Sequence, residues 1–242
     1  SKTKLRRATS RAIAALPACH WATREDDAMP SPESDVLLLH GIWMRRSITL
    51  RLAQRLRAAG YRVHALSYAS VTAPFAAHHA RIDQALATVD PARTHFVGHS
   101  LGGLVVLDYL RTRSERYPHA RAVCLGSPLC GSEMAERLRR LHLDTLGMGQ
   151  ARHILLQGLP EWTGPQAVGV IAGDLPLGWN VLLGRLPKPN DGTVAVRETQ
   201  LPGIRDHRVV HASHTGLLFS DPAARLCIEF LRSGAFRAPA AG

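Results

Sequence analysis

The chain has 242 residues and a mass of 26.4 kDa, a length that suits one domain with a substantial core. Hydrophobic residues make up 45% of the chain and charged residues 20%, a composition that excludes a disordered protein. No apolar run approaches the roughly 20 residues that a membrane-spanning helix needs.

The formal net charge is +11, and nearly all of the basic excess is arginine. A positive charge of this size can attract an anionic partner such as a nucleic acid or a membrane surface. The arginines are spread over several predicted helices without interleaved aromatic residues, which favours solvated helix faces and a GC-rich codon bias. We therefore expect no nucleic-acid partner and at most a weak contact with a membrane surface.

The first 32 residues differ in composition from the rest of the chain. They begin basic, become acidic and end in a proline-rich stretch. We interpret residues 1–32 as a mobile arm and residues 33–242 as the folded domain. The apolar stretch Ile13–Leu16 is shorter than the roughly 7–15 residues of a signal-peptide core, which favours a cytoplasmic location.

The remaining chain alternates between short apolar strands and helices. In chain order we expect strand 36–40, helix 48–59, strand 61–68, helix 74–89, strand 94–98, helix 101–111, strand 120–126, strand 168–172, strand 208–211 and helix 222–231. This alternation predicts an α/β fold with a mostly parallel central sheet and helices on both faces.

Between residues 128 and 165 the regular alternation stops. Residues 133–146 predict a basic amphipathic helix, and residues 152–160 predict a shorter helical piece. A small cap over a site would lie in this part of the chain, and the alternative is one ordinary crossover helix.

The most informative segment is 94–106, in which an apolar strand runs into Gly-His-Ser-Leu-Gly (98–102) and then into an apolar helix. A serine at such a sharp strand-to-helix turn has its hydroxyl pushed out of the sheet. The turn leaves almost no room for side chains at Gly98 and Gly102. We therefore predict that Ser100 is a nucleophile; the alternative is a glycine-rich turn with an incidental serine.

A serine hydroxyl reacts only when a base takes its proton and a carboxylate orients that base. With the nucleophile on this kind of turn, the partners follow in the order acid, then histidine. His214 lies in a loop just after an apolar strand and is the favoured base, with His211 as its rival. Asp191, in the turn before that strand, is the favoured acid, with Asp174 as the alternative.

Strand 36–40 ends in His-Gly, which lets the backbone turn towards the nucleophile without an intervening side chain. The N–H groups of Ile42 and Leu101 would then converge on a developing oxyanion. The glycine and the apolar strand before it also fit an ordinary turn.

Three tryptophans, Trp43, Trp162 and Trp179, are candidates to line an acyl pocket, and ordinary packing is the alternative for each. The four cysteines form no Cys-x-x-Cys pair and no set with zinc spacing, and no phosphate-binding or dinucleotide motif occurs. We expect no metal and no cofactor.

Five elements occur in a consistent order: a strand ending in His-Gly-Ile, Gly-His-Ser-Leu-Gly-Gly, Leu-Gly-Ser-Pro after the next strand, Asn-Asp-Gly-x-Val and a late Ser-His-Thr. Together they resemble the α/β-hydrolase superfamily, and within it small bacterial lipases and carboxylesterases, over residues 35–232. The resemblance implies Ser100, Asp191 and His214 as a catalytic triad, and an oxyanion hole from the two N–H groups above. Arg45 and Arg46 give the oxyanion loop an unusually charged exit.

We expect a serine hydrolase that cleaves carboxylic esters, lipid esters included, through an acyl-enzyme intermediate. An acyltransferase with the same triad and a non-catalytic binding or scaffold protein are the alternatives. The sequence does not determine the acyl-chain length, the alcohol half of the ester or the oligomeric state.

Overall fold

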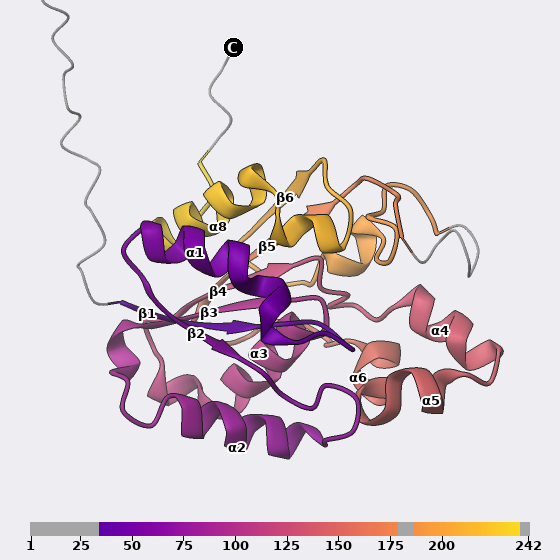
Figure 1. The fold of residues 1–242 in the computed structure, drawn as a ribbon, viewed down its shortest axis with the longest axis horizontal. Coiled ribbons are helices and arrows are strands. Elements are labelled where there is room, and N and C mark those ends of the chain that lie inside the picture. Colours follow the sequence, from indigo (N-terminus) through magenta and orange to yellow (C-terminus); the bar gives the residue numbers. More distant parts are fainter. Residues whose placement is uncertain (1–33, 179–185, 238–242) are drawn as a thin grey trace, which may run out of the picture.

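A computed structural model describes residues 34–178 and 186–237, so the expected arm and Trp179 lie outside the described residues (Figure 1). The core of the fold is a six-stranded sheet with the order β2-β1-β3-β4-β5-β6. Every neighbouring pair of strands is parallel. The strands are β1 (Asp35–Leu39), β2 (Arg62–Leu66), β3 (Thr94–His99), β4 (Arg121–Leu125), β5 (Ala167–Gly173) and β6 (Asp206–Val210).

Helices cover both faces of the sheet, as the continuous apolar strands predict. One face carries α1 (Leu50–Ala58) and α8 (Asp221–Ser233), and the other carries α2 (Phe75–Ala85) and α3 (Leu101–Arg113) (Figure 1). Each face has its own apolar cluster, and alternate residues of β1 enter one cluster or the other. The predicted α/β-hydrolase architecture is confirmed.

The last helix shows how local signals set its limits. Ser220 Oγ accepts a hydrogen bond from the Ala223 N–H at the start of α8, and Pro222 occupies the first turn, where its missing N–H needs no partner. Gly234 ends the helix in the left-handed conformation, with φ 78°.

Between β4 and β5 lie three short helices, α4 (Glu133–Arg140), α5 (Asp144–Met148) and α6 (Arg152–Gln157). The expectation of one helix over 133–146 is wrong. The chain leaves α4 through a Schellman turn, in which the Leu143 N–H donates to the Leu138 carbonyl and the His142 N–H to the Arg139 carbonyl. His142 adopts φ 56° at the position that glycine usually occupies, so the sequence carried no stop signal. The assignment of 128–165 as a cap stays a prediction.

No helix in the described part of the chain is both long enough and apolar enough to cross a bilayer.

Candidate active site

Ser100 lies at the turn between β3 and α3 with φ 55° and ψ −123°, a backbone conformation that is strained for any residue with a side chain. The Ser100 N–H donates to the Leu125 carbonyl at 2.8 Å, which holds the turn against β4. A Cβ atom on Gly98 would lie 2.4 Å from the backbone of Gly102, and one on Gly102 would lie 2.7 Å from the His40 carbonyl oxygen. No larger residue fits at either glycine.

His214 and Asp191 form a buried pair. The His214 Nδ1–H donates to Asp191 Oδ2 at 2.7 Å, and the His214 backbone N–H donates to the Asp191 carbonyl at 2.8 Å. The other carboxylate oxygen, Oδ1, accepts from the N–H groups of Thr193 at 2.9 Å and Val194 at 2.7 Å. These bonds orient the carboxylate and leave His214 Nε2 as the ring nitrogen that can take a proton.

The two rival residues, His211 and Asp174, pair with each other instead. Their Nδ1 and Oδ1 atoms are 2.8 Å apart, and the His211 side chain is 77% exposed. Neither residue lines the cavity that contains Ser100. The exposed pair has nearly the same separation between its two side chains as the buried pair, but it faces solvent.

Ser100 and His214 line one cavity of about 530 Å³. Apolar side chains of the three helices between β4 and β5 form one side of it: Met134, Ala135, Leu138, Met148 and Leu155. Trp43 also lines this cavity. The expectation for Trp162 is wrong, since that residue is buried in the core and its Nε1–H donates to the Gln166 carbonyl at 3.0 Å.

The loop after β1 packs directly against the serine. A Cβ atom on Gly41 would lie 3.0 Å from Ser100 Cβ, and the next residue, Ile42, lines the cavity. Among the hydrogen bonds of the described residues, none uses the Ile42 N–H. Leu101 is the first residue of α3, where N–H groups have no acceptor within the helix. Both amides are thus available next to Ser100, and their role in an oxyanion hole stays a prediction.

Two further residues shape the site, and sequence reasoning assigned neither of them this role. The first is His99, which is fully buried and whose Nε2–H donates to the His214 carbonyl at 2.9 Å across a separation of 115 residues. Burial lowers the pKa of His99 to about 3, so the ring stays neutral. This bond anchors the backbone of His214 to the end of β3.

The second is Gly126, which follows β4 with φ 54°. A Cβ atom here would lie 3.1 Å from Asp191 Oδ2 and 3.2 Å from His214 Nδ1. The Leu-Gly-Ser-Pro motif contains this glycine, but only the structure shows that its missing side chain makes room for the acid–histidine pair.

Within the described ranges, no group of three or more His, Cys, Asp or Glu side chains is arranged to hold a metal ion.

A family model described as the alpha/beta hydrolase family matches residues 36–241. The chain belongs to this family, as the motifs predicted. A sequence comparison with curated proteins finds no match.

Solved structures of bacterial lipases and esterases share the fold. The mature form of the lipase BlEst2 from Bacillus licheniformis superposes with a TM-score of 0.63 at 16% identity, covering 84% of this chain and 93% of that one. The propeptide form gives 0.65 at 17% identity over 87% of this chain, which spans only 53% of that longer one. An esterase from Exiguobacterium antarcticum gives 0.55 at 14% identity, with 83% and 92% covered. At these identities the likeness concerns the fold.

Proposed function

We propose that this α/β hydrolase cleaves carboxylic esters, lipid esters included, with Ser100 as nucleophile, His214 as base and Asp191 as acid. The observation that carries the proposal is the buried His214–Asp191 hydrogen bond of 2.7 Å beside the cavity that Ser100 lines. A buried carboxylate that accepts the Nδ1–H fixes the tautomer in which Nε2 is a base.

The mechanism follows from this arrangement. His214 Nε2 takes the Ser100 proton while Oγ attacks the ester carbonyl carbon, and the carbonyl oxygen becomes an oxyanion. The N–H groups of Ile42 and Leu101 donate hydrogen bonds to that oxyanion. His214 then returns the proton to the departing alcohol, which leaves an acyl group on Ser100. Water attacks the acyl group in the same way and releases the acid.

The lining of the cavity supports an apolar acyl half. Its wall of Met, Leu and Ala side chains offers no charged partner to the chain of a fatty acid, and burial of each CH₂ group contributes about 0.8 kcal/mol. We therefore expect the specificity constant to rise with acyl length until the cavity is filled and then to fall.

The test is labelling with a fluorophosphonate, with 4-nitrophenyl esters of graded acyl length assayed alongside. Wild type is expected to label and to turn over with a length optimum, whereas Ser100→Ala loses the label and at least about 10⁴-fold in kcat. Ser233→Ala, at the end of α8, is the matched control and keeps both. Label that persists in Ser100→Ala contradicts the proposal, and so does a folded wild type that neither labels nor hydrolyses.

An alcohol added to the same assay separates hydrolysis from acyl transfer. Ester formation beyond the ratio expected from the acceptor concentration would identify an acyltransferase.

A further inference from the structure

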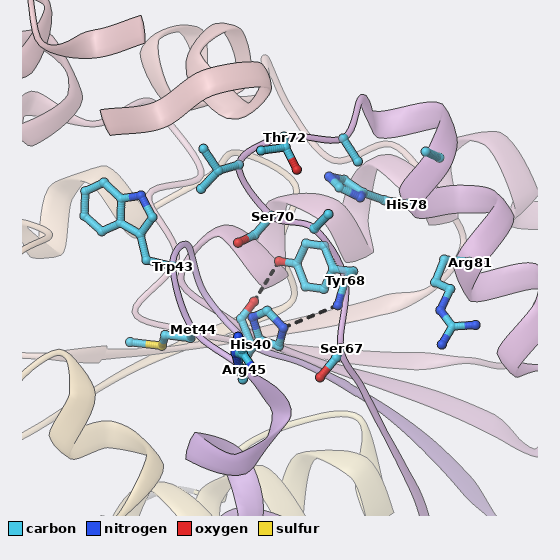
Figure 2. Close-up of a pocket in the computed structure, with 14 residues that line it drawn as sticks. His40, Trp43, Met44, Arg45, Ser67, Tyr68, Ser70, Thr72, His78 and Arg81 are labelled. Carbon is cyan, nitrogen blue, oxygen red and sulfur yellow. Dashed lines mark hydrogen bonds between the residues drawn. The ribbon is translucent and has the colours of Figure 1, made fainter. Parts of the chain in front are cut away.

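A second cavity of about 650 Å³ adjoins the one that contains Ser100, and Figure 2 shows the residues that line this second cavity. It lies between the loop after β1, residues 67–73 and the start of α2, and we call it the second pocket. Trp43 and Met44, which directly follow Ile42, line both cavities. The two cavities therefore meet at the residues next to the proposed oxyanion hole.

One wall of the second pocket is a rigid set of stacked rings. His40 and Tyr68 stack with centroids 4.6 Å apart, and the Tyr68 hydroxyl donates to the His40 carbonyl at 2.7 Å (Figure 2). The His40 Nδ1–H donates to the Gly41 carbonyl at 2.8 Å. The polar atoms of this wall are thus largely occupied by one another.

His78 is the exception. It is only 2% exposed, its ring meets Tyr68 edge-on at 4.8 Å and Phe75 at 5.5 Å, and its Nε2 has no hydrogen-bond partner among the described residues. Burial lowers the pKa of His78 to about 4, so the ring is neutral and offers one N–H donor and one acceptor. An unpaired buried polar atom destabilises the folded state, so this nitrogen in a pocket wall indicates a missing partner.

The charge at the second pocket is uniformly positive. Arg45 and Arg81 line it, and no acidic residue does. No carboxylate among the described residues pairs with either guanidinium group; Arg81 donates only to the Gln84 side chain, at 2.7 Å. The lining also includes the hydroxyl side chains of Ser67, Ser70 and Thr72 (Figure 2). Donors and unpaired cations without a carboxylate favour an anion.

We propose that the second pocket binds an anionic group, a carboxylate or a phosphate, carried by the alcohol half of the substrate. The inference rests on the proposed function. With the ester carbon at Ser100 and the acyl chain in the apolar cavity, the alcohol half extends past Trp43 and Met44 into the second pocket. His78 and the hydroxyl groups donate to the anion, and the two arginines supply the attraction.

The test compares two butyryl esters of similar size and different charge, one of 3-hydroxybenzoate and one of 3-hydroxybenzamide. Wild type is expected to prefer the anionic ester in kcat/KM. Arg45→Gln and Arg81→Gln each lower the ratio of anionic to neutral rates by about fivefold. Arg111→Gln, near the far end of α3, removes the same charge outside both cavities and leaves the ratio unchanged.

A variant of His78 separates ligand binding from packing. His78→Phe keeps the ring contacts and removes the unpaired nitrogen Nε2, so the melting temperature is expected to stay or rise while the rate ratio falls. A lower melting temperature with an unchanged ratio would assign His78 to packing and overturn its part in the proposal.

Binding of the anion to the second pocket can also be measured directly, without turnover of an ester. Titration of free 3-hydroxybenzoate into Ser100→Ala by calorimetry is expected to show binding that weakens about fivefold in Ser100→Ala/Arg81→Gln. Absence of this binding overturns the anion site. Binding together with equal rates for the two esters overturns its link to the substrate. Loss of all ester hydrolysis refutes the proposed function but not a site that still binds the anion.

Discussion

At the scale of single residues, two Asp–His pairs of nearly equal length lie beyond the ends of β5 and β6, and burial separates them. The Asp191–His214 pair is enclosed, whereas the Asp174–His211 pair faces water. Solvent screens an exposed pair, so the attraction that would stabilise an imidazolium ion is much weaker there. Only the enclosed pair is therefore suited to hold a charge that forms during catalysis.

Replacing Asp191 with Asn tests this difference. Asn keeps an oxygen for the Thr193 and Val194 N–H groups, but it does not hold the tautomer of His214, so kcat is expected to fall about 10³–10⁴-fold. Asp174→Asn is the matched control and should stay within about threefold of wild type. The measurement is the steady-state kcat of both variants on one 4-nitrophenyl ester. Equal losses of kcat in the two variants would reject Asp191 as the catalytic acid.

Gly126 and Gly234 offer a second matched pair, since both have positive φ angles. Alanine in place of either is expected to destabilise the fold by about 1 kcal/mol because of backbone strain. Only the Cβ atom at position 126 would press on Asp191 and His214. A Cβ atom at position 126 would also lie 2.8 Å from Leu217 Cδ1, so denaturant unfolding should show a larger stability loss in Gly126→Ala than in Gly234→Ala, and ester assays should show a loss of activity in Gly126→Ala alone. An active Gly126→Ala enzyme would show that the pair can shift without consequence.

At the scale of elements, a buried carboxylate joins α4 to the turn η5 (Val196–Thr199). Glu198 accepts from the Ala195 N–H at 2.7 Å and from the Glu133 N–H, at the start of α4, at 2.6 Å. Burial raises the pKa of Glu198 to about 7, and the nearby Asp191 adds to this effect. The folded protein therefore holds a proton on Glu198 at pH values where the unfolded chain has lost it.

This difference predicts a pH dependence of stability. A pKa raised from 4.5 to about 7 means that folding favours the protonated form, so the contribution is present at low pH and is lost as pH rises through about 7. The loss between pH 5 and pH 8 is on the order of 2 kcal/mol. Glu198→Gln cannot titrate, so the stability difference between wild type and variant should change across this range in urea unfolding. A constant difference would contradict the raised pKa.

At the scale of the whole molecule, the sheet separates two apolar clusters that share its strands. Cys124 lies in the cluster under α3 and Cys227 in the cluster under α8, and both thiols are fully buried. Because each strand contributes alternate side chains to both faces, loss of one cluster would expose half of every strand. We expect the two faces to unfold together.

The reactivity of the Cys124 and Cys227 thiols tests whether the two faces of the sheet unfold together. In a protein with Cys19→Ser and Cys130→Ser, both remaining thiols should react with Ellman's reagent only upon global unfolding, at one common rate. Burial raises the pKa of both thiols, which further suppresses reaction in the folded state. Wild type supplies the control, since Cys130 is exposed and is expected to react in the folded protein. Two distinct rates in the variant would show that one face opens independently of the other.

Much of the fold could be predicted because its signals are local. Apolar runs identify the central strands of the sheet, and five adjacent residues, 98–102, identify the strand-to-helix turn at Ser100. The break after α4 was missed because His142 takes a conformation that its side chain disfavours and that the Schellman hydrogen bonds stabilise. Trp162 was misplaced because an apolar side chain suits a core and a pocket equally well.

The fold class, the serine turn and the order of candidate acid and base could be read from the amino-acid sequence, since these depend on neighbouring residues and on chain order. The folded structure was needed to show which aspartate meets which histidine, that His99 anchors His214, and that the unpaired Nε2 of His78 belongs to a cavity that two arginines also line. Those contacts join residues far apart in the chain, and their distances are set by the order of strands in the sheet and by the loops that meet at its carboxyl edge.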